Sequence, residues 1–213
     1  MQLTQILTSL GASVLIFSFM NTANGQIVTQ NKSDDVILEM SQAFKKNDKA
    51  QLSRLLPKAK GHILEPWAAY WELRLRLDQA STAEIQEFLS TYAGTYAEDR
   101  LRNDWLLQLG RQREWSLVAQ EYPRYRMNDD REVRCYALGT DALLNKPETP
   151  AELKKLWYAL RESDDGCTTV AEKLHEAKKL DTLDLWRKAR LAMDNNRPRA
   201  AQAALNIESV EIG

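Results

Sequence analysis

The chain has 213 residues, 44% of them hydrophobic, and its 29 basic and 30 acidic side chains leave a formal net charge of -1. A chain of this length can bury a core as one domain, and its balanced charge argues against binding to nucleic acid or to an anionic membrane. With only 8 Gly and 6 Pro, placed mostly between amphipathic segments, the sequence favours an all-α fold.

The N-terminus has the pattern of a secretory signal. Residues 6–20 carry no charge and are too few to span a bilayer comfortably, which takes about 20 residues. Ala23 and Gly25 stand at the small-residue positions of a cleavage site. We predict a signal peptide over 1–25, a polar linker over 26–32 and a helical domain over 33–213, in a secreted protein. Because no basic residue precedes Ile6, an uncleaved anchor is the main alternative. No second apolar run could span a bilayer.

Two helical hairpins are predicted in the first half of the domain. Ser33 can cap a helix that reaches Phe44, and Asp48 can cap a shorter one that Pro57 ends. The second hairpin begins with Pro66 at the first helical position, which suits proline. Its second helix has the capping-box pair Ser81 and Glu84, the apolar stripe Ile85, Phe88, Leu89 and Tyr92, and Gly94 at its end.

The third hairpin contains the most distinctive stretch, Asn103 to Trp115. Leu101, Trp105 and Leu109 recur at intervals of four and share a helical face. Gly110 is predicted to end this helix in the left-handed conformation, and Trp115 starts the next stripe. We expect Trp105, Leu109, Gly110 and Trp115 to hold neighbouring helix pairs together.

Further helices follow in the last third. One is predicted from Asp129 to Leu144, and the next from Thr149 as N-cap with Pro150 as first residue. A helix near Val170 to Ala177, another capped by Asp181 and an Ala-rich one opened by Pro198 complete the chain.

Cys135 and Cys167 are the only cysteines. In an oxidising compartment we expect them to form a disulfide that joins the fourth hairpin to the loop 164–168. Two buried, reduced thiols are the alternative.

The spacing of the hairpins suggests a repeat. Trp71 to Trp105 spans 34 residues and Trp105 to Tyr136 spans 31, close to the lengths of helical repeats, although later spacings do not hold. We therefore predict a right-handed α-superhelix, a solenoid of stacked, degenerate hairpins similar to tetratricopeptide repeats.

No motif for catalysis, cofactor binding or metal binding is present. Glu172 and His175 have the Glu-x-x-His spacing of di-metal bundles, but a second copy is missing, so His175 is interpreted as a surface residue. The Arg residues of the middle third alternate with Asp and Glu, which indicates solvated helix faces. Aromatic residues at helical spacing indicate core packing rather than platforms for carbohydrate.

The stretch Asn103 to Trp115, with Ala68 to Leu77 before it and Cys135, Gly139 and Cys167 after it, resembles the N-terminal superhelical domain of soluble lytic murein transglycosylases. The likeness runs from about Asp34 to Met193. In that family a C-terminal lysozyme-like domain cleaves peptidoglycan, with one glutamate acting as acid and then base. That glutamate stands in a Glu-Ser motif before an aromatic residue.

This chain has Glu208 and Ser209, but Val210 follows them instead of an aromatic residue, so we reject Glu208 as catalytic. The resemblance implies a non-catalytic scaffold from a periplasmic transglycosylase, with peptidoglycan or cell-wall proteins as partners and no activity of its own. The rival hypothesis is an independent periplasmic adaptor of the tetratricopeptide type that binds a protein or peptide.

Overall fold

The computed structural model describes residues 23–209, with side chains from 34 to 208. Within that range the chain forms twelve α-helices and two 3-10 helices, and no strand, so the all-α prediction is confirmed. The helices of the first half are α1 Ala23–Lys45, α2 Lys49–Leu55, η1 Leu56–Ala59, α3 Glu65–Leu75, α4 Thr82–Thr91, α5 Tyr96–Arg111, α6 Trp115–Glu121 and η2 Tyr122–Arg124. Those of the second half are α7 Arg131–Leu138, α8 Asp141–Leu144, α9 Thr149–Tyr158, α10 Asp165–Glu176, α11 Thr182–Asp194 and α12 Pro198–Ser209.

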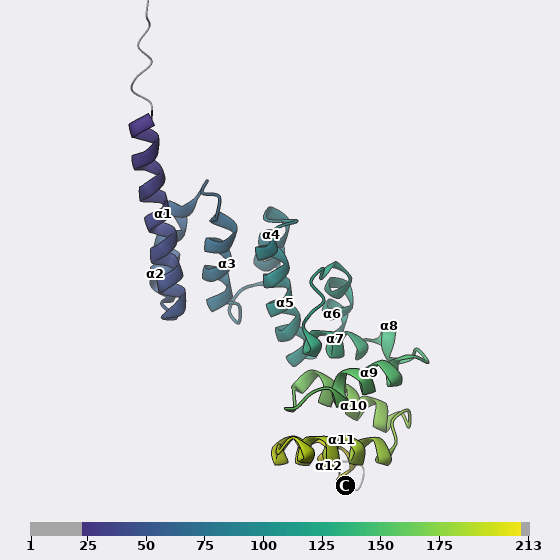
Figure 1. Ribbon diagram of the computed structural model, residues 1–213. Coiled ribbons are helices and arrows are strands. Elements are labelled where there is room, and N and C mark those ends of the chain that lie inside the picture. The colour runs from purple at the N-terminus through teal and green to yellow at the C-terminus, as the bar shows by residue number, and fades with distance from the viewer. Residues whose placement is uncertain (1–22, 210–213) are drawn as a thin grey trace, which may run out of the picture.

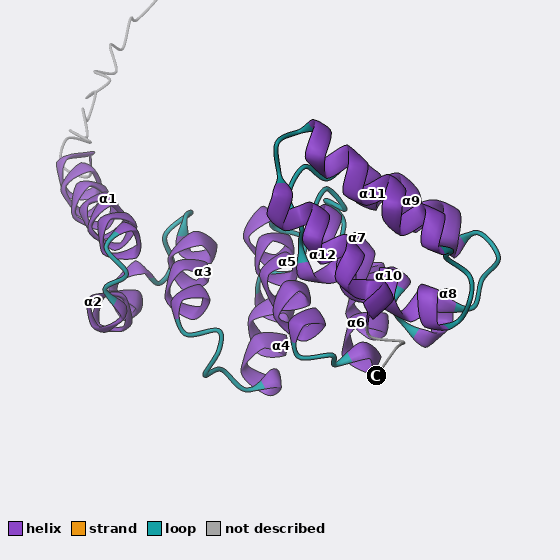
Figure 2. Cartoon of the chain, turned by 90° about the horizontal axis from the view of Figure 1, so that it is seen from below, coloured by secondary structure: helices purple, strands orange, loops and turns teal. Residues whose placement is uncertain are grey.

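The helices follow one another along an elongated molecule (Figure 1). One series packs in sequence order: α1 against α3, α3 against α5, α5 against α7, α7 against α10 and α10 against α12. In the first half, α2, α4 and α6 lie on one side of this series, as the view from below shows (Figure 2). Most packing therefore joins elements that are close in the sequence.

The core is divided among three clusters of buried apolar side chains. The first joins α1, α2 and α3 and contains Met40 and Leu52. The second runs from α3 to α7 around Trp105, and the third runs from α7 to α12 around Trp157. Partly buried Trp71 packs against both the first and the second cluster, so these two are continuous.

Several predicted helix starts are confirmed. The side chains of Asp48, Ser81 and Asp181 each accept a hydrogen bond from a backbone N–H in the first turn of α2, α4 and α11. At α9 the prediction was one residue off, because Glu148 takes the cap position and Thr149 is the first helical residue. Such shifts of one residue are common where a proline fixes the first turn.

Residues 26–32, predicted as a linker, lie within α1, which begins at Ala23. The segment after Gly25 has neither Gly nor Pro, and its Gln, Lys and apolar residues are compatible with a helix. Most of the predicted signal peptide, 1–25, lies outside the described residues, because these begin at Ala23. The signal peptide therefore stays a prediction. Among the described helices, none combines the length and apolar character needed to cross a membrane.

The single helix predicted from Asp129 to Leu144 is instead two, α7 and α8. Asp130 caps α7, which ends before Gly139. A Cβ atom at Gly139 would lie 2.8 Å from the Val170 side chain, so the chain passes very close to α10 at this break. The sequence pattern did not predict this close approach.

Four hairpin turns share one hydrogen-bonding pattern. Asn47, Arg113, Lys178 and Asn196 take the left-handed conformation, with φ between 54° and 61°. At each turn the N–H of this residue donates to the carbonyl three residues earlier, and the next N–H donates to the carbonyl five residues before it. This Schellman pattern satisfies carbonyls that a helix end would otherwise leave unpaired.

Candidate functional site

The four motif residues lie in α5 and at the start of α6. Trp105 and Leu109 are buried in the central cluster with Tyr136 of α7. Trp115 is half-buried, and its ring centroid lies 6.4 Å from that of Tyr136. These three residues occupy the junction between the hairpin α5–α6 and α7.

Gly110 has a different role from the one predicted. It lies inside α5 rather than at a left-handed helix end. A Cβ atom at Gly110 would stand 2.2 to 2.5 Å from three ring atoms of Tyr136, which is far closer than real contacts allow. Gly110 therefore lets the Tyr136 ring pack directly on the backbone of α5, and Arg113 makes the turn instead.

Arg113 links this turn to α10. Its guanidinium donates to the carbonyl of Gly110 at 2.8 Å, to the carboxylate of Asp165 at 2.5 and 3.0 Å, and to the hydroxyl of Thr169 at 2.8 Å. The ammonium of Lys173 lies 3.8 Å from the centroid of the Trp115 ring, a cation–π contact. The motif region thus contacts a helix more than fifty residues further along the chain.

Cys135 and Cys167 form a pair capable of a disulfide. Their sulfur atoms lie 1.99 Å apart, their Cα atoms 4.8 Å apart, and both side chains are buried. Cys167 stands in the first turn of α10 rather than in a loop. The pair therefore joins α7 directly to α10.

The interpretation of the middle-third charges as solvated is wrong for α5. Six charged or amide side chains in this region are at most 5% exposed: Glu98, Asp99, Arg102, Asn103, Asp104 and Glu121. Because α3, α4, α6, α7 and α10 all contact α5, its polar positions are covered as well as its apolar stripe. The spacing of Glu98 and Arg102 suggested an ion pair, but their burial depends on the surrounding helices, which the pattern could not reveal.

Arg102 is central to these buried charges. Its guanidinium pairs with Glu98 at 2.6 Å and with Glu121 of α6. Arg126 approaches Glu98 at 2.9 Å from the other side, and Arg124 approaches Glu121 at 3.1 Å. Glu98 and Glu121 therefore have two cationic partners each, which offset the cost of burying their charges.

Two other buried carboxylates fix neighbouring segments. Asp99 accepts hydrogen bonds from the backbone N–H groups of Arg126 and Met127, at 2.9 and 2.7 Å. Asp104 accepts from the hydroxyl of Tyr70 at 2.8 Å and pairs with Arg74 at 2.9 Å. Burial and this carboxylate raise the pKa of Tyr70 to about 12. These contacts hold the segment after η2 and helix α3 against α5.

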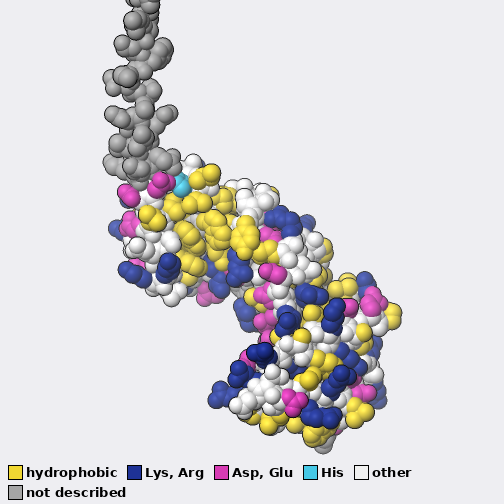
Figure 3. Space-filling view, in the orientation of Figure 1, with side chains coloured by type: hydrophobic (Ala, Val, Ile, Leu, Met, Phe, Trp, Pro, Cys, Tyr) yellow, Lys and Arg dark blue, Asp and Glu magenta, His cyan; other side chains and the backbone are white. Residues whose placement is uncertain are grey.

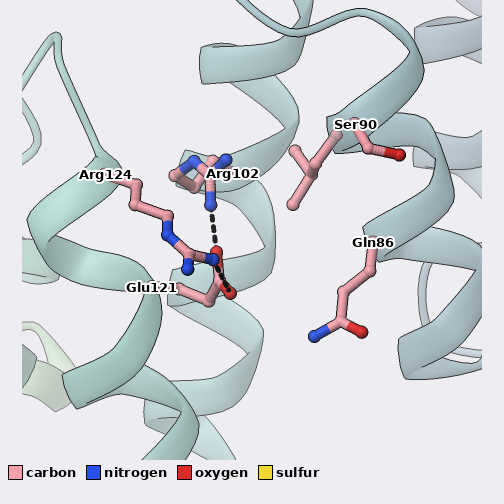
Figure 4. A pocket seen from close by; sticks show the side chains of 6 residues that line it. Gln86, Ser90, Arg102, Glu121 and Arg124 are labelled. Carbon is pink, nitrogen blue, oxygen red and sulfur yellow. Dashed lines mark hydrogen bonds and ion pairs between the residues drawn. The ribbon is translucent and has the colours of Figure 1, made fainter.

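A cavity of about 220 Å³ opens beside this network, between α4 and the hairpin α5–α6. Gln86 and Ser90 of α4 line one side, and Arg102, Glu121 and Arg124 line the other (Figure 4). The two arginines contact Glu121 rather than open space. The accessible lining of the cavity is mostly apolar, and its one carboxylate is already paired with both arginines.

A row of aromatic rings crosses α1, α3 and the start of α5. Ring centroids lie 6.2 Å apart between Phe44 and Trp71, 6.3 Å between Trp71 and Trp67, and 5.6 Å between Trp67 and Tyr96. Tyr96 is 59% exposed and the other three are half-buried, so this row is only partly core. Figure 3 shows a continuous hydrophobic area over α1 and α3 on this side of the molecule. We call these four residues the aromatic row.

The two histidines lie in different parts of the fold. His175 is 7% exposed, not on the surface as predicted, and its Nδ1 lies 2.9 Å from the carbonyl of Leu180 just after the α10 turn. His62 lies 2.8 Å from Asp34 and accepts a hydrogen bond from the N–H of Leu64. Among the residues whose side chains are described, no three His, Cys, Asp or Glu gather closely enough to hold a metal ion.

One buried lysine stands apart from these clusters. Lys188 of α11 is 1% exposed and donates to the carbonyls of Trp157 and Leu160, at 2.8 and 2.7 Å, where α9 ends. Burial lowers the pKa of Lys188 to about 8, against the opposing effect of Asp164, and burial raises the pKa of Asp164 to about 6. The lysine supplies hydrogen bonds that the end of α9 needs.

Comparison with known proteins adds no relative: no protein family, no curated protein and no solved structure matches this chain.

Proposed function

We propose that this protein is a helical-repeat scaffold, a right-handed solenoid of degenerate hairpins, that binds other molecules without catalysing a reaction. The observation that carries the proposal is the series α1, α3, α5, α7, α10 and α12, in which each helix packs against the next. The left-handed turn residues Asn47, Arg113 and Lys178 stand 66 and 65 residues apart, which is two hairpins of about 33 residues each. This spacing of three of the four turn residues supports the proposed repeat, while Asn196 falls outside it.

Within this class, we propose that the scaffold is the arm of a periplasmic protein related to the soluble lytic murein transglycosylases, with cleavage of peptidoglycan carried out elsewhere. The motif residues Trp105, Gly110 and Trp115 support this parentage because they form the junction between hairpins. The Cys135–Cys167 pair is compatible with an oxidising compartment such as the periplasm.

The aromatic row supports contact with peptidoglycan. The faces of Trp and Tyr rings can pack against the apolar faces of sugar rings, as they do against other apolar surfaces, while their polar edges stay wet. Phe44, Trp71, Trp67 and Tyr96 extend across three successive helices of the series. Such a row suits an extended ligand better than a compact one.

Sedimentation with purified sacculi tests this function. Mature protein is expected to sediment with sacculi, and the double variant Trp67→Ala with Trp71→Ala is expected to stay in the supernatant. Trp186→Ala is the matched control, since Trp186 is 50% exposed but lies on α11, away from the aromatic row. Equal sedimentation of both variants would refute the role of the row. Release of anhydro-muropeptides by the protein alone would refute a purely scaffolding function.

The second candidate is a periplasmic adaptor of the tetratricopeptide type. The cavity beside Arg102 favours it, since the cavity could receive a side chain of a bound peptide. An adaptor of this kind would remain in the supernatant of the same sacculus experiment.

A further inference from the structure

A second cavity, of about 300 Å³, lies further along the chain and is larger than the one beside Arg102. It opens where α6 and η2 face α7 and α8, in the middle of the molecule (Figure 1). Its accessible lining is almost wholly apolar and consists of Ala119, Tyr122, Pro123, Ala137, Thr140, Ala142 and Leu143. We call this space the α6–α8 cavity.

The α6–α8 cavity follows from the shortness of α8. This helix has four residues, whereas α4 has ten, and α2 and α6 have seven each before a 3-10 turn extends them. Because α7 ends at Leu138 and α8 covers only one turn, part of the surface between α6 and α7 stays uncovered. All the walls come from residues 119–143, so the cavity is bounded entirely by the interior of the chain.

The walls of this cavity are fixed by hydrogen bonds to groups outside it. The carbonyl of Leu143 accepts from the hydroxyl of Thr149, and Lys179 donates to the last carbonyl of α8 at 3.3 Å. On the other wall, the hydroxyl of Tyr122 donates to the side chain of Asn128 at 3.0 Å. A ligand would therefore enter a space that is already formed and would not have to order the walls itself.

The chemistry of the lining selects the kind of ligand. No lining side chain is charged, and the hydroxyls of Thr140 and Tyr122 already donate, to the carbonyl of Ala137 at 2.7 Å and to Asn128. A charged ligand would lose hydration in the cavity without gaining an ionic partner from these side chains. An uncharged apolar molecule gains from leaving water, and the Tyr122 ring suits an aromatic one.

The volume of the cavity sets the size of the ligand. An apolar cavity of roughly 150 Å³ holds one benzene ring. The α6–α8 cavity has about twice that volume. It therefore fits two fused rings, or about ten carbon atoms.

The surroundings of the cavity favour a free molecule over a protein or a membrane. Among the described side chains, the large apolar ones that are well exposed lie on α1, before α3, at the start of α5 and on α11, and none lies on α6, α7 or α8. Protein interfaces have an extended apolar centre, and membrane insertion also needs exposed apolar side chains. The exposed neighbours of the lining residues include Gln120, Arg124 and Asp141 instead. The apolar surface is thus confined to the cavity.

We propose that the α6–α8 cavity binds a free, uncharged, two-ring aromatic molecule. The ligand lies between Tyr122 and Pro123 on one side and Ala142 and Leu143 on the other. It bridges α6 and α8, which do not pack on each other as α5 packs on α7. This site is separate from the aromatic row, and the proposal does not depend on contact with peptidoglycan.

Naphthalene is the probe for this site. Equilibrium dialysis against the intact protein measures its binding directly, by absorbance of the two chambers after extraction. The control ligand is naphthalene-1,5-disulfonate, which has the same rings with a charge at each end. At least one sulfonate would have to enter the apolar cavity, so we expect no measurable binding of this ligand.

Protein variants locate the bound probe by filling the cavity. Ala119→Leu and Ala142→Leu add three carbon atoms each from opposite walls, at positions that are half-buried and exposed. We expect each to weaken naphthalene binding at least about tenfold, and far-ultraviolet circular dichroism checks that the fold is kept. Ala83→Leu, the same change at an exposed residue of α4 outside the cavity, should leave binding unchanged.

A further control addresses the other apolar surface. The double variant Trp67→Ala with Trp71→Ala alters the aromatic row and leaves the α6–α8 cavity intact, so it should bind naphthalene as the unchanged protein does. Binding that is lost in this variant would place the probe on the aromatic row and overturn the proposal.

Three other results would also overturn the proposal. They are no binding of naphthalene up to its saturated solution, equal binding by both cavity-filling variants and the unchanged protein, and equal binding of the disulfonate. Binding of naphthalene that is lost in Ala119→Leu and Ala142→Leu but kept in Ala83→Leu would support it. Sedimentation with sacculi does not enter any of these outcomes, so this proposal and the proposed scaffold function fail separately.

Discussion

The region around α5 and the region from α10 to α12 have different interiors. Around α5 the core contains large aromatic side chains and a buried network of charges centred on Arg102. From α10 to α12 the core is rich in alanine, and the Cys135–Cys167 pair joins it to α7. The first region is held by charge pairs centred on buried Arg102, and the second by close helix approach and a covalent link. The two should therefore respond to different perturbations.

The largest expected effect breaks the charge network. Arg102→Met would leave Glu98 and Glu121, which are 3% and 1% exposed, without their shared partner. Removing one partner from a buried ion pair costs about 3–5 kcal/mol of unfolding free energy. Arg124→Met is the matched control, since Arg124 contacts the same Glu121 from a side chain that is 60% exposed, and it should cost under about 1 kcal/mol. Equal losses in urea denaturation would contradict the importance of burial.

The second prediction concerns the covalent link. Replacing both Cys135 and Cys167 by Ala should lower the unfolding free energy by about 3–4 kcal/mol, since the bond closes a loop with a sequence separation of 32. Hydrogen exchange should accelerate in α7 and α10 and change little in α3 and α4. Two reactive thiols in the oxidised, denatured protein would show instead that the link is absent.

A smaller effect is expected at Gly110. Gly110→Ala would place a methyl group within 2.5 Å of the Tyr136 ring and should destabilise by about 1–3 kcal/mol through overpacking. The measurement is a double-mutant cycle with Tyr136→Ala, in which the methyl group should cost much less once the ring is gone. Additive effects of the two substitutions would contradict direct contact between α5 and α7 at this residue.

The last prediction is a pH dependence in the second region. Lys188 has a pKa of about 8 in the folded protein, against about 10.4 in an unfolded chain. Between these values the unfolded state binds more protons, so the free energy of unfolding should rise with pH. Lys188→Met should remove this rise, which is about 3 kcal/mol across the whole interval, while Lys155→Met at an exposed site of α9 should keep it. An unchanged slope in Lys188→Met would assign the rise to other groups.

The helices were largely predictable because their starts have local causes. The side chains of Asp48, Ser81 and Asp181 each cap a helix by accepting a hydrogen bond from the backbone N–H three residues later. The pairing of Cys135 with Cys167 followed from there being no other cysteine. These features depend on a few neighbouring residues or on a count, which a sequence shows directly.

The features that were missed depend on distant packing. Gly110 looked like a helix end, but its role is set by Tyr136, twenty-six residues later. Glu98, Asp99 and Asp104 looked solvated, because nothing in α5 reveals that five other helices cover it. Gln86 and Ser90 gave no signal at all, since a cavity wall needs no particular residue type. The solenoid arrangement and the partners stay proposals for the experiments described above.

The Cys135–Cys167 link also has a mechanical consequence. Because most packing joins elements close in sequence, a force applied between the two ends would be expected to detach helices one after another rather than all at once. With the link intact, the chain between Cys135 and Cys167 cannot extend, which shortens the fully stretched chain by about 110 Å at about 3.4 Å per residue. The junction of α7 with α10 would then stay closed under a tension that separates the remaining pairs of helices.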